Sequence, residues 1–143
     1  MIKNLTITNS TKIKINKIKI HNLVQILKSE LNFKVESVSI NFLTEQQIIP
    51  INNEYLGHNF STDIITFNYS GENYTLDGEI FISLDDALFN AKKYGNDLKN
   101  EILRLIIHGF LHLVGYDDKE KNDRTKMKNI ENRLVNKYLN HLT

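Results

Sequence analysis

The stretch ILRLIIHGFLHLVGY, residues 102–116, constrains the fold more than any other part of the chain. Asp97, five residues before it, is a good N-cap, and apolar residues cover almost every side of the helix that would follow. A helix that is apolar nearly all round is stable in water only when other elements surround it. The sequence therefore predicts a helix that begins after Asp97 and runs through the centre of the fold.

Two histidines interrupt this apolar helix four residues apart. At 3.6 residues per turn, His108 and His112 lie on one face with Cβ atoms about 5–6 Å apart, so two ring nitrogens can bind one metal ion. Gly115 can end the helix in the left-handed conformation, and the returning chain can bring Asp117 or Asp118 to the same ion. Such a set leaves one position for water, as catalytic zinc sites do. A bare histidine pair is more often packed core, but the glycine and the acid favour a metal site.

The residue after the first histidine bears on the type of reaction. In the H-E-x-x-H metalloproteases, a glutamate at this place is the general base. Here the place is taken by Gly109, which has no side chain. The sequence therefore argues against a peptidase, and a metal-activated water would need another partner.

Composition limits the remaining function classes. The chain has 143 residues, 41% of them hydrophobic, which is typical of a single domain over residues 1–143. It has no cysteine, so metal ligands must come from His, Asp and Glu. No apolar run or leader segment suggests a membrane span or secretion, so we expect a cytoplasmic protein with no membrane partner. With a net charge of +1, an RNA substrate would need local positive charge or a partner that supplies affinity.

Periodicity and capping signals divide the chain into short strands and helices. The Thr44–Gln47 capping box begins one helix, which Pro50 should kink or shorten. The expected strands cover residues 2–8, 35–42, 63–69 and 79–84, the last two as a hairpin. The other expected helices cover residues 16–31, a segment from Asp85 as N-cap to Gly95, the central helix, and a C-terminal helix from about 119. This mixture indicates an α+β fold built in layers.

Three blocks of the sequence resemble one protein family. HGFLHLVGYDD, residues 108–118, is similar to the HGxLHLxGYDH signature of the YbeY family. NEYLGHNFSTDIITF, residues 53–67, and DGEIFIS, residues 77–83, resemble two further blocks of that family. The resemblance implies a single α+β domain in which a mixed, roughly four-stranded sheet packs with about five helices around a buried metal-binding helix.

The resemblance also implies a function. YbeY proteins are metal-dependent endoribonucleases, so we expect single-strand-specific cleavage of rRNA precursors, notably maturation of the 16S rRNA 3′ end, and a part in ribosome quality control. The expected cofactor is one divalent metal, zinc before others, with His108, His112 and Asp118 as ligands. The expected partners are single-stranded RNA and the ribosome or its small-subunit proteins, with no DNA.

Two further residues have both a structural and a functional interpretation. Thr62 and Asp63 form a common turn pair before a strand, but the resemblance puts them beside the metal cleft, where Asp63 could orient a histidine or the attacking water. Arg104 lies one turn before the first histidine. It is a surface arginine, an ion-pair partner of Glu101 or Asp97, or a group that binds a phosphate near the metal.

The chain also departs from the family pattern. Leu56 stands where the family has an arginine that is important for cleavage, and either His58 or Arg104 would have to replace it. Asp118 stands where the family usually has a third histidine, which should leave bound water less acidic and admit harder metals than zinc. These departures keep an alternative open, a non-catalytic ribosome-assembly factor with a structural metal, for which Asp117 would be a fourth ligand.

Overall fold

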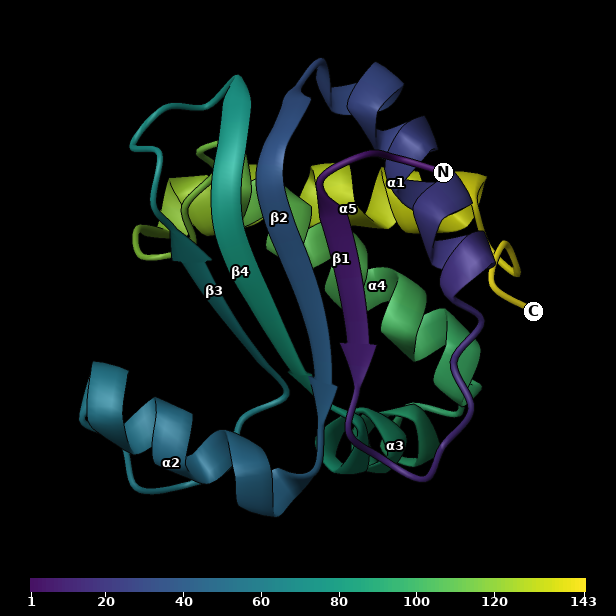
Figure 1. The fold of residues 1–143 in the computed structure, drawn as a ribbon, viewed down its shortest axis with the longest axis vertical. Coiled ribbons are helices and arrows are strands. Elements are labelled where there is room, and N and C mark those ends of the chain that lie inside the picture. Colours follow the sequence, from purple (N-terminus) through teal and green to yellow (C-terminus); the bar gives the residue numbers. More distant parts are fainter.

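A computed structural model describes all residues, 1–143, and its centre is a four-stranded mixed sheet in the order β1-β2-β4-β3 (Figure 1). β1 pairs in parallel with β2 and β2 with β4, whereas β3 is antiparallel to β4. The strands are β1 Leu5–Asn9, β2 Lys34–Leu43, β3 Ile64–Asn68 and β4 Thr75–Ser83. The helices are α1 Lys17–Leu31, α2 Glu45–Leu56, α3 Leu84–Lys93, α4 Leu98–Leu113 and α5 Lys121–Lys137. The expected single α+β domain with a mixed sheet and five helices is confirmed.

Helix α4 lies behind the sheet and is the buried central helix that the sequence predicts (Figure 1). Its N-cap is Asp97, whose side chain accepts a hydrogen bond from the Asn100 backbone N–H at 2.8 Å. From Asn100 to Leu113 every residue is buried except three that share one face, Arg104, His108 and His112. Burial on all other sides therefore leaves this helix a single accessible stripe, at a spacing of four residues.

The glycine between the histidines explains how closely α4 approaches the sheet. A Cβ atom on Gly109 would lie 3.0 Å from Cδ1 of Ile80 on β4 and 3.3 Å from Cδ1 of Ile64 on β3. Any larger side chain would push α4 away from both strands, because packed interiors hold few voids. Gly109 thus faces the core and not the accessible stripe.

Helix α4 ends in the left-handed turn that Gly115 predicts. Gly115 has φ +101°, and its N–H donates to the His112 carbonyl at 3.0 Å. The Tyr116 N–H donates to the Leu111 carbonyl, also at 3.0 Å. This pair of bonds is a Schellman motif, which satisfies the last carbonyls of the helix and turns the chain back across its end.

Several boundaries differ from the sequence prediction, and the first is that of β1, which begins at Leu5 and not at residue 2. β4 begins at Thr75, four residues before the expected start, because it pairs on both sides and its buried alternation extends back through Leu76. Ser83 is the N-cap of α3 in place of Asp85, since its hydroxyl accepts from the Asp86 N–H. α2 continues through Pro50 to Leu56, so the proline does not end it. None of the helices has the length and apolar character needed to cross a bilayer.

Candidate metal centre

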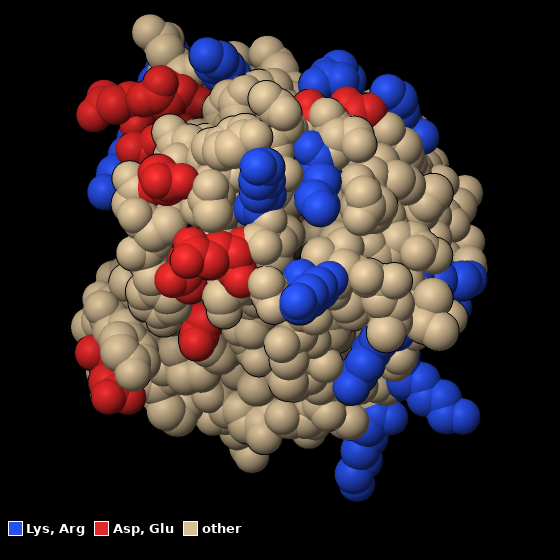
Figure 2. All heavy atoms as spheres, turned by 45° about the horizontal axis from the view of Figure 1, so that its top comes forward, with Lys and Arg blue, Asp and Glu red and all other residues tan.

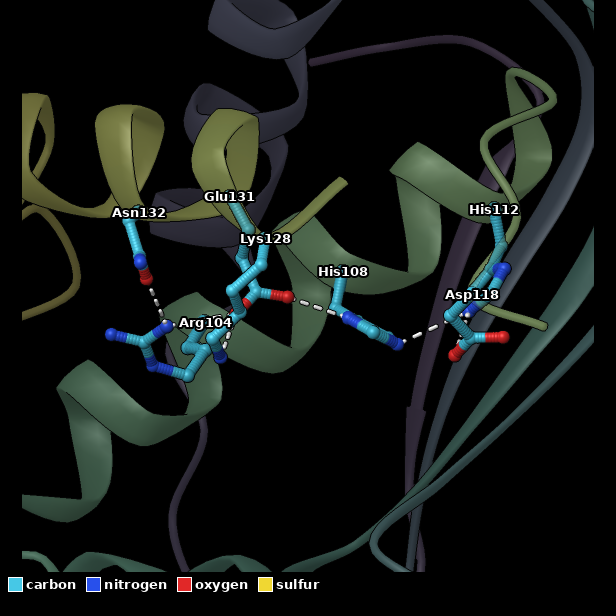
Figure 3. A network of polar contacts seen from close by, with 7 residues as sticks. All are labelled: Arg104, His108, His112, Asp118, Lys128, Glu131 and Asn132. Atoms are coloured by element: carbon cyan, nitrogen blue, oxygen red, sulfur yellow. Dashed lines mark hydrogen bonds and ion pairs between the residues drawn. The ribbon is translucent and has the colours of Figure 1, made fainter. Parts of the chain in front are cut away.

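The two histidines of α4 point their Nε2 atoms at one another across 3.1 Å (Figure 3). Two nitrogens that bind one tetrahedral ion at 2.0–2.1 Å are about 3.3–3.4 Å apart. The observed separation therefore fits a shared ion with only a small adjustment of the rings. The i, i+4 spacing on a straight helix is the cause, since it stacks His108 over His112 on the one accessible stripe of α4.

The turn after α4 adds one carboxylate to the pair. Oδ2 of Asp118 lies 3.4 Å from Nε2 of His112, and the donor atoms of His108, His112 and Asp118 all lie within 4.8 Å of one another. The neighbouring Asp117 is engaged elsewhere, because its Oδ1 accepts the Lys119 backbone N–H at 3.0 Å. Of the two acids that the sequence left open, Asp118 is the one beside the histidines. Two imidazoles and a carboxylate form a donor set that divalent zinc accepts.

The electrostatics of His112 suit a ligand. Burial lowers the pKa of His112, and the positive charge of His108 lowers it further, while Asp118 opposes the shift. A lowered pKa keeps the imidazole neutral near pH 7, so that a lone pair is available. Metal binding requires that deprotonated form.

Glu131 on α5 is a member of this site that the sequence analysis missed. Its Oε1 lies 2.5 Å from Nδ1 of His108, and its Oε2 accepts from Arg104 Nη1 at 2.8 Å and from Lys128 Nζ at 2.9 Å (Figure 3). Burial by itself would raise the pKa of Glu131, but the hydrogen bonds and charges of His108 and Lys128 prevail and lower it to about 2. Glu131 is therefore an ionised, acceptor-only carboxylate near pH 7.

The sequence did carry one signal for Glu131. The apolar face of the C-terminal helix contains Met127 and Leu134, and Glu131 lies between them at helical spacing, where a charged residue is out of place. A buried acid in an apolar stripe needs a partner, because an unpaired buried charge is costly. That pattern predicts some cationic or N–H partner, but not which one.

The ion pair with Glu101 or Asp97, one of the alternatives considered for Arg104, is not formed. Arg104 bonds neither Glu101 nor Asp97; its Nη1 donates to Oε2 of Glu131 and, at 3.1 Å, to Oδ1 of Asn132. Glu101 is buried, and burial raises its pKa although the charge of Arg104 opposes this. Helix α5 packs against α4 and brings Glu131 and Asn132 to Arg104, so this arginine bonds residues of α5 and not its neighbours in sequence.

Asp63, just before β3, lines a cleft together with His108. Its Oδ2 accepts from Asn90 Nδ2 of α3 at 3.1 Å. Burial raises the pKa of Asp63, and the positive charge of His108 partly offsets this. The carboxylate makes no hydrogen bond to either histidine, so it lies near the metal group without belonging to the set of donors.

A cleft of about 1140 Å³ joins these residues, with walls from α3, α4, α5 and the start of β3. The lining includes four residues of the predicted site, Asp63, Arg104, His108 and Asp118, and also Glu131, but not His112. Neither Leu56 nor His58 belongs to it. A volume of this order accommodates part of a nucleotide chain or a comparable polar ligand.

Comparison with known proteins decides the family. The family model described as Endoribonuclease YbeY matches residues 2–139. The chain belongs to the YbeY family. A protein named Endoribonuclease YbeY from Chlorobium limicola is 42% identical over 116 residues, which is 81% of this chain and 79% of that protein. Its namesake from Parabacteroides distasonis is 41% identical over 102 residues, 71% of each chain. The solution structure of TM1509 from Thermotoga maritima has a TM-score of 0.66 at 26% identity and covers 92% of this chain and 86% of that one.

The position where the family pattern predicts an arginine lies at the end of α2. Leu56 is the last residue of that helix and is half exposed, and His58, in the following loop, stacks on Phe60 with ring centroids 5.1 Å apart. Of the two residues considered as replacements for the arginine that the family pattern predicts, only Arg104 lines the cleft that contains His108. Arg104 is therefore the residue of α4 that places a permanent positive charge in this cleft.

Proposed function

We propose that this chain is a metal-dependent endoribonuclease that cleaves single-stranded RNA. The observation that carries the proposal is that donor atoms of His108, His112 and Asp118 lie within 4.8 Å of one another, beside a cleft that His108 and Asp118 line, in a chain that belongs to an endoribonuclease family. The two Nε2 atoms 3.1 Å apart are the core of that convergence.

In this proposal His108, His112 and Asp118 hold one divalent ion, with zinc as the first candidate. Such an ion, when bound, polarises a phosphoryl oxygen and makes water more acidic. Three protein donors are one fewer than structural zinc sites use, and Asp117 is committed to the Lys119 backbone. That count supports catalysis over a purely structural metal.

We assign Arg104 and Asp63 to the substrate and the attacking water. Arg104 uses Nη1 for Glu131 and Asn132, so its remaining N–H groups are free to bind a phosphate oxygen that enters the cleft. Asp63 uses Oδ2 for Asn90, which leaves Oδ1 to orient a water or accept its proton. Its raised pKa brings it nearer to neutral pH, where a general base is most effective.

Single-stranded RNA fits the cleft better than a duplex does, because a cleft of this size admits unpaired nucleotides more readily than a stiff double helix. Net charge is +1, and in Figure 2 most acidic side chains lie on the left of the face, whereas Lys and Arg are scattered over all of it. Charge alone would therefore give weak RNA binding. We propose that the substrate is an rRNA precursor, notably at the 16S rRNA 3′ end and in ribosome quality control in the cytoplasm, with ribosomal small-subunit proteins supplying affinity.

The central test compares wild type with His112→Ala. Each protein is loaded with Zn²⁺ and given a single-stranded RNA, the same sequence as a duplex, and an rRNA precursor. We expect wild type to cut the unpaired RNA and the precursor, and His112→Ala to lose at least about 100-fold in rate, because catalysis would lack a ligand. Arg104→Lys should lower the rate while leaving zinc bound. Undiminished cleavage by folded His112→Ala would remove the metal from the mechanism.

The second candidate function is a non-catalytic ribosome-assembly factor with a structural metal. Leu56, in place of the family arginine, is the observation that favours it. A zinc-loaded wild type that cuts none of the RNAs but binds small ribosomal subunits would support this candidate and overturn the proposed activity.

A further inference from the structure

We propose that Glu131 is a positioning residue: its carboxylate fixes the His108 ring as the Nδ1–H tautomer and directs Nε2 toward the metal position. The contact that carries the proposal is the 2.5 Å approach of Glu131 Oε1 to Nδ1 of His108, from a helix 23 residues further along the chain (Figure 3). This inference rests on the proposed function, because it concerns a ligand of the metal named there.

The tautomer follows from simple hydrogen-bond accounting. An ionised carboxylate only accepts, so the ring nitrogen facing Glu131 must carry the hydrogen. A protonated His108 would have an N–H on both nitrogens, whereas the neutral form that binds a metal has one N–H and one lone pair, so in that form the lone pair of His108 is on Nε2. That is the atom 3.1 Å from Nε2 of His112. Carboxylate–histidine–metal arrangements of this type orient the ring and make the ligand more basic.

Glu131 is itself held rigidly enough to do this. Its side chain is 3% exposed, and Lys128 and Arg104 both donate to the oxygen that His108 does not use. Their side chains are 59% and 29% exposed, so either cation could turn to water if the carboxylate were lost. Nδ1 of His108 has no other hydrogen-bond partner, so loss of the carboxylate would remove the contact that orients this ring.

One carboxylate therefore connects the metal ligand His108 with the phosphate-binding candidate Arg104. Oε1 bonds the histidine and Oε2 bonds the arginine. Because both bonds start from the same planar group, a shift of α5 would move the two side chains together. The docking of α5 on α4 thus belongs to the construction of the site.

The experiment uses Glu131→Gln and Glu131→Leu, with Glu30→Gln as the matched control. Glu30 also receives ion pairs from α5, from Lys137 at 2.7 Å and Arg133 at 3.7 Å, but it contacts no histidine. Zn²⁺ affinity is measured by competition with a chromophoric chelator, and folding by thermal unfolding. We expect both Glu131 variants to bind Zn²⁺ about 10–100-fold more weakly than wild type and Glu30→Gln to match wild type.

The second readout is the ¹⁵N NMR signature of the His108 ring in the metal-free protein. In Glu131→Gln the two cationic donors attract the amide oxygen, which turns the amide N–H₂ toward Nδ1. We expect the ring proton to sit on Nδ1 in wild type and in Glu30→Gln, and on Nε2 in Glu131→Gln. If Glu131 only stabilised the fold, its replacement would not change which nitrogen of His108 carries the proton.

The outcomes separate the two proposals. If wild type binds Zn²⁺ and His112→Ala does not, the metal site stands. If in that case folded Glu131→Gln keeps wild-type affinity and the Nδ1–H signal, the positioning role of Glu131 is wrong. If wild type binds no Zn²⁺, the metal-dependent function fails, and the role of Glu131 fails with it.

Discussion

At the scale of single residues, Gly109 shows how one position serves the fold and restricts the chemistry. A Cβ at this place would meet Ile80 on β4 and Ile64 on β3, so the position points into the core. The neighbouring His108 points the other way, toward the cleft. A glutamate at position 109 would therefore be buried in the core and would not reach water at the metal.

Gly109→Glu tests this geometry. We expect no peptidase activity and a free energy of unfolding lower by about 3 kcal/mol or more, because the side chain would overpack the core and bury a carboxylate. Urea unfolding followed by circular dichroism measures the change. Gly109→Ala is the control and should cost less, since it adds only one methyl against flexible isoleucine ends. A stable, proteolytic Gly109→Glu would contradict the orientation of α4.

At the scale of elements, the end of α4 sets the third donor. The Schellman motif at Gly115 reverses the chain within a few residues, and Asp118 then lies beside His112. Gly115 also packs against Asn73: a Cβ there would be 2.6 Å from Asn73 Nδ2. The loop between β3 and β4 thus supports the turn that carries the carboxylate.

Gly115→Ala should therefore damage both stability and metal binding. The left-handed backbone costs a non-glycine residue about 1–2 kcal/mol, and the contact with Asn73 would displace the turn that carries Asp118. Gly71→Ala is a matched control, because Gly71 has φ +70° with nothing within 4 Å of a Cβ. We expect both variants to lose stability in urea, but only Gly115→Ala to bind Zn²⁺ more weakly in the chelator assay. Equal zinc affinity in the two variants would count against Asp118 as a ligand.

At the scale of the whole molecule, the site joins segments that are distant in the sequence. Asp63 precedes β3, the histidines lie on α4, and Glu131 comes from α5. A ligand that binds only this folded arrangement must stabilise the whole chain, because the unfolded chain presents no such set of donors.

Zinc should accordingly raise the thermal unfolding midpoint of the chain. At a free concentration of about 100 times Kd, a ligand that binds only the folded state adds about 2.7 kcal/mol to the free energy of unfolding. Differential scanning calorimetry with and without Zn²⁺ gives the shift, and a chelator should reverse it. His112→Ala should show almost none of it. An equal shift in that variant would mean that zinc binds elsewhere.

The sequence by itself determined the features that depend on local pattern. Apolar residues at helical spacing specify α4 as the central helix, the i, i+4 spacing puts His108 and His112 on one face, and Gly115 ends the helix. Each of these follows from backbone geometry within a few residues, so no knowledge of distant contacts is needed. The alternation of the strands and the family signature belong to the same class.

Only the tertiary structure decided which distant residues meet. It selected Asp118 over Asp117 for the histidine pair, gave Arg104 the partner Glu131 in place of Glu101, and brought Glu131 to His108. Local periodicity indicates that Glu131 is on the buried face of α5, but the angle and height at which α5 crosses α4 come from packing of the whole core. Those long-range contacts fix the orientation of the candidate metal ligands, and they are a property of the assembled fold.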